Sequence, residues 1–216
     1  MSAPTPFVIK DCNLSIIATG IVAESLIELR DHLYEIPLSS IYYHFWGGRL
    51  RISFAHPEYH NDFARFAHFG LNDEILTERL AIVDPTEYEN LEDLRKKVID
   101  IIEERIEEIN IVIWSKNEYK FNFLRSIIIT YDSKTKIESP PDLKTLIPKL
   151  TPSSIFYHFI DSRRRTQEKK DDFSYWLSQF ENKNEELINK IKEIDPYFLS
   201  ISEIKQKLNE LFNRYL

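Results

Sequence analysis

Apolar residues recur every three or four positions along most of the chain, a spacing that places them on one face of an α-helix. In the first half, Leu26, Leu29 and Leu33 follow this spacing and predict a helix over residues 23–34. A second helix is predicted around the Tyr-Tyr-His-Phe stretch at 42–45, and further helices over residues 63–69, 73–83 and 91–110. Helix is therefore the main element expected in this half.

Strand-like stretches precede the helices in each half of the chain. Residues 119–124 and 126–131 are rich in aromatic and β-branched side chains, and the turn-forming Asp132-Ser133-Lys134 follows them. Residues 7–10 and 14–19 are their counterparts near the start of the chain. Each half is therefore predicted to open with a β-hairpin, and the two hairpins could share one small sheet.

The two halves resemble each other at a constant offset of 114 positions. Residues 39–45, Ser-Ser-Ile-Tyr-Tyr-His-Phe, recur at 153–159 as Ser-Ser-Ile-Phe-Tyr-His-Phe. Phe7 matches Phe121 at the same offset, and after a four-residue contraction Asp62-Phe63 matches Asp172-Phe173. Colinear matches of this kind indicate an internal repeat. They predict that the chain consists of two copies of one module.

Together these patterns predict an α+β, mainly helical fold that arose by tandem duplication. Each module would hold a β-hairpin followed by about five helices, and pseudo-two-fold symmetry would relate the copies. The first module is assigned to residues 1–114 and the second to residues 115–216.

The repeat unit resembles an uncharacterised prokaryotic domain, the domain-of-unknown-function family numbered 5752. The residues that carry this resemblance in the first half are Ser40, Tyr43, His44, Phe45, Asn61-Asp62-Phe63, Phe66 and Asn72-Asp73-Glu74-Ile75-Leu76. Those in the second half are Ser154, Tyr157, His158, Phe159, Asp172, Phe173 and Trp176. The second half departs from the pattern over residues 181–186. The resemblance implies two tandem copies of this domain and implies no activity.

Composition narrows the class of protein. The chain has 216 residues, of which 43% are hydrophobic, and a single cysteine, Cys12. One cysteine cannot form an internal disulfide. No apolar run approaches the roughly 20 residues that cross a bilayer, and the first residues lack the pattern of a secretory signal. We therefore expect a soluble, cytoplasmic protein. High Ile, Lys and Glu usage with only three Gln suggests a thermophilic source.

Charge is divided unevenly between the halves. The net charge is −7, but residues 1–114 contain 10 Lys and Arg against 20 Asp and Glu, whereas residues 115–216 contain 18 against 15. The acidic half and the mildly basic half could each present an ordinary solvated surface. Alternatively, the basic half could contact an anionic partner.

Each half contains a histidine followed by an aspartate, His44 with Asp62 and His158 with Asp172. Such a pair can act as a general base, with the carboxylate orienting the imidazole. The same residues also fit a buried histidine bonded to an aspartate at a helix junction. Apart from the repeated serines before each histidine, which occupy helix-cap positions, no nucleophile recurs in both halves, so no catalytic residue is assigned.

No metal site and no cofactor is predicted. His56 and His60 have the spacing of two metal ligands on one helical face. However, Pro57 follows directly, the stretch has loop character, and neither histidine has a counterpart in the second half.

Arginine and lysine residues form the candidate site for an anion or a partner. The densest basic segment lies at residues 163–170, where the first half has two arginines at the matching positions. Such a loop could contact phosphates or an acidic protein surface, or could be a solvated loop. The candidate residues are Arg49, Arg51, Arg163, Arg164, Arg165, Lys169 and Lys170.

The function that these observations favour is that of a non-enzymatic, cytosolic interaction or regulatory protein, with another protein or an anionic molecule as its partner. Two alternatives remain open. One is association with RNA or the ribosome through the basic second half, and the other is a His-dependent hydrolase or transferase with its site between the copies. No membrane association is expected.

Overall fold

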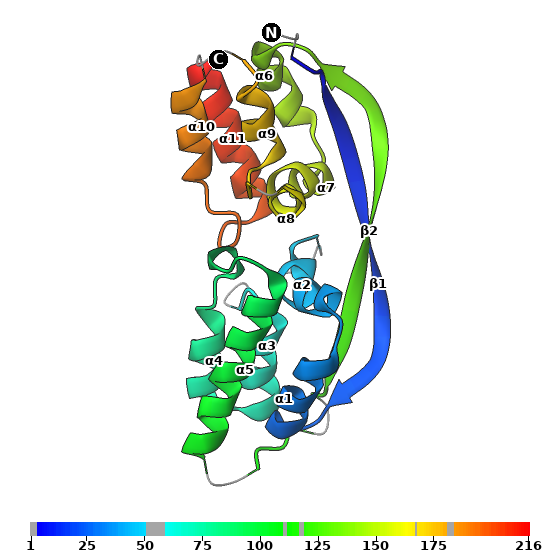
Figure 1. Cartoon of the computed structure of the whole chain (residues 1–216), viewed down its shortest axis with the longest axis vertical. Coiled ribbons are helices and arrows are strands. Elements are labelled where there is room, and N and C mark those ends of the chain that lie inside the picture. The colour runs from blue at the N-terminus through cyan, green and yellow to red at the C-terminus, as the bar shows by residue number, and fades with distance from the viewer. Residues whose placement is uncertain (1–3, 51–58, 110–111, 117–118, 167, 181–183) are drawn as a thin grey trace. The chain divides into compact units, whose positions relative to one another are not determined.

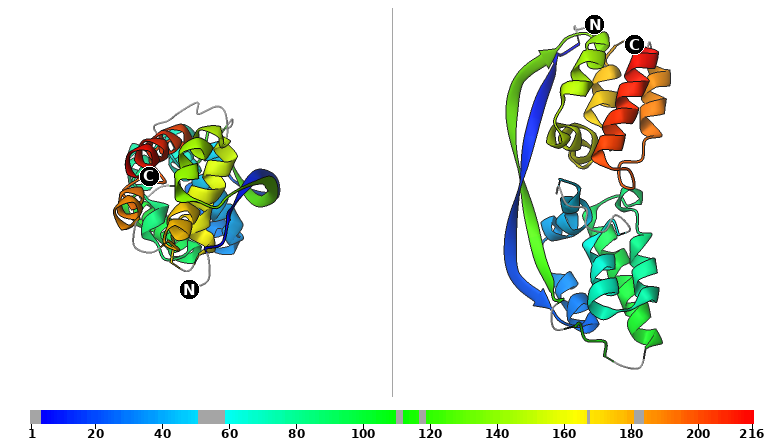
Figure 2. Two further views of the ribbon diagram at one scale, coloured as in Figure 1. Left: turned by 90° about the horizontal axis from the view of Figure 1, so that it is seen from above. Right: turned by 180° about the vertical axis from the view of Figure 1, so that it is seen from behind.

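The computed structural model describes residues 4–50, 59–109, 112–116, 119–166, 168–180 and 184–216. Two long strands, β1 (Phe7–Ala23) and β2 (Phe121–Ile137), pair with each other in an antiparallel, two-stranded sheet. Figures 1 and 2 show them lying side by side, with helices and their connecting loops in the rest of the described chain. The prediction of an α+β, mainly helical fold is confirmed.

The prediction of a β-hairpin in each half is wrong. Each half contributes one continuous strand, and the pairing joins β1 to β2 across the two halves. The expected turn at Asp132-Ser133-Lys134 is a local feature inside β2, where Lys134 adopts a φ of 60° and Asp132 Oδ1 accepts a hydrogen bond of 2.7 Å from the Lys134 N–H. These turn-forming residues therefore adopt a local turn conformation within the strand without reversing the chain.

The residues in contact form two compact units. Unit 1 comprises Met1–Asn13 and Ile128–Leu216, and unit 2 comprises Leu14–Ile127. Both strands pass from one unit to the other, so each unit contains part of β1 and part of β2. The expected modules 1–114 and 115–216 are halves of the sequence, whereas the units are groups of residues in contact. The two divisions differ mainly in the strands, because each unit takes strand residues from both halves.

Unit 2 contains helices together with part of β1 and part of β2. Its helices are α1 (Leu26–Glu35), α2 (Leu38–Trp46), α3 (Asp62–Arg65), α4 (Glu74–Ala81) and α5 (Leu91–Glu108), with a π-helical turn at Phe66–Leu71 and 3₁₀ turns at Gly47–Leu50 and Pro85–Glu87. Helix α5 contacts α1, α2 and α4 through a stripe of buried Leu94, Val98 and Ile102. This stripe has the three-to-four spacing of an amphipathic helix.

Unit 1, like unit 2, contains α-helices, a π-helical turn and 3₁₀ turns. Its helices are α6 (Leu143–Leu146), α7 (Pro152–Ile155), α8 (Ser162–Arg165), α9 (Asp172–Leu177), α10 (Glu185–Lys192) and α11 (Ile201–Tyr215), with a π-helical turn at Phe156–Asp161 and 3₁₀ turns at Pro140–Asp142 and Ile147–Lys149. Helix α10 contacts both α9 and α11 (Figure 1). The core combines aliphatic side chains with aromatic ones, which include the fully buried Phe156, Phe159, Phe173 and Phe212.

Within the described residues, every helix is too short or too polar to span a membrane.

Candidate functional site

In unit 2, the side chains of Ser40 and His44 hold the backbone of Leu124 in β2. Ser40 Oγ donates a hydrogen bond of 2.6 Å to the Leu124 carbonyl oxygen. The Leu124 N–H donates a hydrogen bond of 3.1 Å to His44 Nε2. The two side chains lie four residues apart on α2, so they project from the same face of the helix. We call this pair the Leu124 clamp.

In unit 1, Ser154 and His158 hold the backbone of Lys10 in β1 in the same way. Ser154 Oγ donates a hydrogen bond of 2.8 Å to the Lys10 carbonyl oxygen, and the Lys10 N–H donates one of 2.9 Å to His158 Nε2. We call this pair the Lys10 clamp. The hydrogen bonds of both clamps go to main-chain atoms, whereas the histidine rings also pack against strand side chains, His44 against Phe121 and His158 against Phe7.

The structure brings each predicted histidine and aspartate together. His44 Nδ1 lies 2.9 Å from Asp62 Oδ2, and His158 Nδ1 lies 2.8 Å from Asp172 Oδ2. Because Nε2 of each ring accepts a hydrogen bond from a backbone N–H, the ring proton belongs on Nδ1, which donates it to the carboxylate. The aspartates therefore set the tautomer that lets Nε2 accept the strand amide.

Both imidazoles are almost fully buried, with 3% of His44 and 2% of His158 exposed. His44 packs against the rings of Phe63 and Phe121, at centroid distances of 5.4 and 4.7 Å. With both ring nitrogens bonded, neither histidine has a nitrogen available to accept a proton from a substrate while the strand is bound.

The arginines of the candidate anion site bind aspartates of the same unit. Arg164 donates from Nε and Nη2 to Asp161 Oδ1, at 3.2 and 3.0 Å, and Arg165 Nε donates to Asp161 Oδ2 at 3.0 Å. Only 1% of Asp161 is exposed. The two guanidinium groups therefore offset the burial of this carboxylate.

Arg165 also connects this ion-pair network to the Lys10 clamp. Its Nη2 donates to Asp172 Oδ2 and to the Tyr157 carbonyl oxygen, each at 3.0 Å, and its guanidinium lies 4.0 Å from the Tyr157 ring centroid. Burial lowers the pKa of Arg165, but Asp172, together with Tyr157 and Asp161, outweighs this and the net pKa is raised. Asp172 thus accepts bonds from both the clamp histidine and Arg165.

Arg163 lies against the core of unit 1. Its Nε donates a hydrogen bond of 3.1 Å to the Phe159 carbonyl oxygen, and its guanidinium lies 4.8 Å from the Phe159 ring centroid. Its Nη2 is 3.9 Å from Asp171 Oδ2. Burial lowers the pKa of Arg163 and raises the pKa of Asp171, which caps α9 by accepting a hydrogen bond from the Ser174 N–H.

The remaining candidate cations do not join this cluster in a single site. Arg49 belongs to unit 2, where it is buried and its guanidinium lies 5.9 Å from the Trp46 ring centroid. Lys170 forms an ion pair with Glu168, and Lys169 is exposed. Arg51 and His56 lie outside the described residues. Among the residues that the structure describes, no three metal-ligating side chains of the His, Cys, Asp or Glu type gather together.

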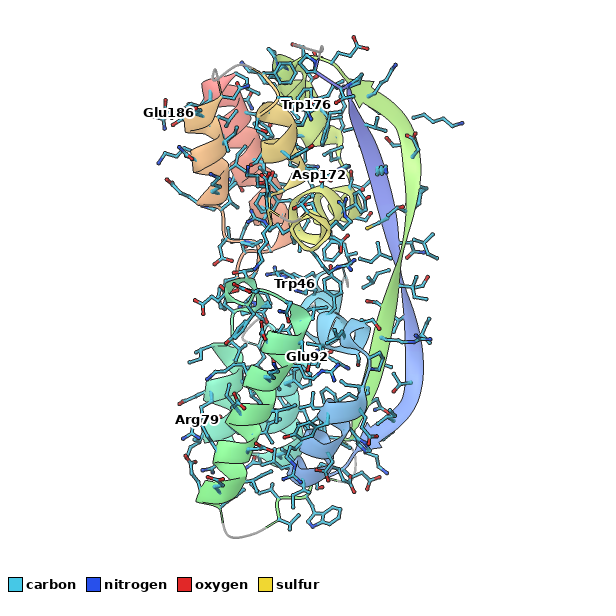
Figure 3. All side chains as sticks on the ribbon, viewed as in Figure 1. Trp46, Arg79, Glu92, Asp172, Trp176 and Glu186 are labelled. Carbon is cyan, nitrogen blue, oxygen red and sulfur yellow. The ribbon has the colours of Figure 1, made fainter. Side chains whose placement is uncertain are left out.

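The sequence pattern identified the repeated serine and histidine but not the groups that they bind. The partners are main-chain atoms of strand residues 80 and 148 positions away from the histidines, and a main-chain partner leaves no trace in residue identity. Two further contacts were also missed, those that Trp176 and Gln179 make with the backbone of Thr5. Figure 3 labels Asp172 at the start of α9 and Trp176 about one turn further along.

The fold and these contacts define a mainly helical α+β protein in which paired serines and histidines hold two long strands. The sequence matches the model of a family of unknown function (DUF5752) over residues 4–213, so the chain belongs to that family. The matched stretch runs across both halves. That the halves are separate copies of the family domain stays a prediction.

One solved structure, that of OrfY from Thermoproteus tenax, is similar to this chain. The two share 24% sequence identity with a TM-score of 0.80, over 99% of this chain and 97% of the OrfY chain. This likeness shows a common fold. No curated protein matches the sequence.

Proposed function

We propose that the protein is a non-enzymatic, cytosolic interaction or regulatory protein whose partner is another protein. The observation that carries this proposal is the hydrogen bonding of the two histidines that could act as general bases. His44 and His158 each spend both ring nitrogens on an aspartate and a strand amide. A histidine held in this way supports a strand and performs no proton transfer.

The exposed side chains of unit 1 favour a protein partner. In β2, the side chains of Ile129 and Tyr131 are each 53% exposed, and in β1 Val8 is 39% exposed. Ile129 and Tyr131 are two residues apart and therefore project from the same face of the strand. Large apolar side chains left exposed on a strand are typical of surfaces that bind other proteins.

The pairing of the arginines disfavours an RNA partner. Arg163, Arg164 and Arg165 are each directed at an aspartate carboxylate of unit 1. Binding to phosphates requires cations whose charge is not already compensated. A protein surface that matches the apolar residues of β2 is therefore the preferred partner class.

Affinity capture from the native cells tests this proposal. A chain that carries both Ile129→Lys and Tyr131→Lys should recover at least about tenfold less of a partner that the unchanged chain retains. Thr130→Lys is the matched control, because Thr130 is also exposed but projects from the opposite face of the same strand. If the double variant recovers the same proteins in the same amounts as the control, the proposed surface is wrong.

We also propose that the two halves arose by duplication of one module. The two clamps support this proposal, because every group in one has its counterpart 114 positions away in the other. The corresponding pairs are Ser40 with Ser154, His44 with His158, and Leu124 with Lys10. Under this proposal, each module's helices hold the strand of the other module.

A further inference from the structure

Unit 1 is discontinuous in sequence. It consists of residues 1–13 and 128–216, and the 114 residues between them form unit 2. We call residues 5–13 the N-terminal segment. This segment completes unit 1 although it joins the rest of the unit only through the other unit.

The backbone of the N-terminal segment is bound at two points by the helical part of unit 1. At one end, Trp176 Nε1 donates a hydrogen bond of 2.7 Å to the Thr5 carbonyl oxygen, and Gln179 Oε1 accepts one of 3.2 Å from the Thr5 N–H. Further along, the Lys10 clamp binds the N–H and the carbonyl oxygen of Lys10.

The segment makes further contacts through its side chains and through Ile9. Ser133 Oγ donates a hydrogen bond of 2.8 Å to the Ile9 carbonyl oxygen, and Thr151 Oγ1 donates one of 2.9 Å to Asp11 Oδ2. Phe7, Ile9 and Cys12 are all buried. The Phe7 ring lies 5.0 Å from that of His158, 5.3 Å from that of Phe173 and 5.5 Å from that of Trp176. We call the residues that receive the segment the acceptor site, namely Ser154, His158, Phe173, Trp176 and Gln179.

We propose that the acceptor site can take the N-terminal segment of a second copy of this chain, which produces a strand-exchanged dimer. Every contact described above joins an atom of the segment to an atom of residues 128–216. The segment of a second copy would therefore make the same contacts, and only the path of the chain after residue 13 would differ. Exchange of an identical element between copies is the established route of domain swapping.

The observations favour a second copy over a different protein as the occupant. The acceptor site receives the buried ring of Phe7 together with backbone atoms at two fixed positions, Thr5 and Lys10. The N-terminal segment meets all of these requirements, and every copy of the chain carries it.

In a single chain, the segment competes for its own acceptor site at an effective concentration that is roughly millimolar for a connected segment. Dilute protein should therefore be monomeric. Exchange should occur when the segment is weakened or when the chain is concentrated to a comparable level.

Two full-length variants test the proposal by complementation. The acceptor chain carries Phe7→Asp and Cys12→Ser, so its own segment is impaired and its acceptor site is intact. The donor chain carries Trp176→Ala, so its segment is intact and its acceptor site is impaired. Cys12 of the donor chain is then the only thiol in the mixture, and its reaction rate with a thiol reagent reports whether the segment is bound.

We expect a complex with twice the 25.7-kDa mass of the chain, seen by light scattering only when the two variants are mixed. We also expect Cys12 of the donor chain to react at least about tenfold more slowly in the mixture than alone, by mass action. The matched control is an acceptor chain that also carries Trp176→Ala, which should give neither effect.

Two results would overturn the proposal. One is a mixture of two folded variants that stays monomeric. The other is a complex in which Cys12 remains as reactive as in the donor chain alone, because that complex would use another surface. If either variant fails to fold, tagged and untagged unchanged chains are mixed near millimolar concentration, warmed briefly and diluted. Recovery of untagged chain with the tagged chain, with Cys12 protected, then supports the exchange, and its absence refutes it.

Discussion

Replacement of His158 by alanine should release the N-terminal segment from unit 1 while the rest of the unit stays folded. The variant removes the acceptor of the Lys10 N–H hydrogen bond, whose length is 2.9 Å, and leaves that part-buried amide without its partner. It also removes a ring that packs against Phe7 and Phe173. The segment keeps its other contacts, which include those of Trp176 and Gln179 with Thr5 and that of Ser154 with the Lys10 carbonyl oxygen.

The magnitude follows from these two losses. An unsatisfied buried N–H destabilises by about 1–3 kcal/mol, so a part-buried amide belongs at the lower end of this range, and the lost packing of a buried ring adds to it. We therefore expect the free energy of opening of the segment to fall by about 2–4 kcal/mol. Each 1.4 kcal/mol corresponds to about tenfold in population, so the open form should become roughly 30 to 1,000 times more populated.

Cys12 provides the assay. It lies in the segment, it is 3% exposed, and burial followed by the nearby Asp11 charge raises the pKa of its thiol to about 12. A buried, protonated thiol does not react, so labelling near pH 8 proceeds through the open form, where the thiol has its ordinary pKa of about 8.5. The labelling rate of His158→Ala should rise by the factor given above.

His44→Ala is the matched control, because it makes the same change in the Leu124 clamp of unit 2, which does not contain Cys12. Its Cys12 labelling rate should stay within about threefold of the unchanged chain. The reasoning is refuted if folded His158→Ala labels no faster than the unchanged chain. It is equally refuted if His44→Ala accelerates labelling as much as His158→Ala does.

Two further predictions concern the buried carboxylates of unit 1. Burial raises the pKa of Asp171 above its usual 3.8, so between that value and the raised pKa the folded state binds more protons than the unfolded state, and stability falls as pH rises. Asp171→Asn keeps an oxygen for the Ser174 N–H and should remove this loss of stability. In denaturant titrations, the stability of the variant relative to the unchanged chain should therefore grow with pH across this interval. A difference that does not depend on pH would contradict the assignment. Asp161→Asn removes the carboxylate that binds Arg164 and Arg165. Because both arginines are partly solvated, we expect the free energy of unfolding to fall by about 1–3 kcal/mol, less than for a fully buried pair. Unchanged thermal unfolding would show that these ion pairs do not stabilise the fold.

Local patterns predicted the helices of the first half well, because a helix depends on residues that are close together in the sequence. Helix α5 begins at Leu91 as expected and ends at Glu108, two residues before the expected end. Its register comes from the three-to-four spacing of Leu94, Val98 and Ile102, which any helix of this sequence would present on one face. The pairing of His44 with Asp62 was also anticipated, because both residues recur together in the second half.

The strand pairing could not be predicted in the same way. Asp132-Ser133-Lys134 has the composition of a hairpin turn, and by local propensity alone a hairpin is the shorter connection. The alternative pairing of β1 with β2 joins segments more than a hundred residues apart. Only contacts with the helices, such as those of the two clamps, make that pairing the more stable one.

The amino-acid sequence alone determined the helical class of this protein, the approximate positions of the helices in its first half and the repetition of a serine and a histidine four residues apart. Those features depend on side-chain spacing within one segment, which propensity and periodicity describe. The tertiary structure decided what the repeated residues do, because Ser154 and His158 bind the main chain of Lys10. A backbone amide or carbonyl is present at every position, so only the folded chain selects which one is bound.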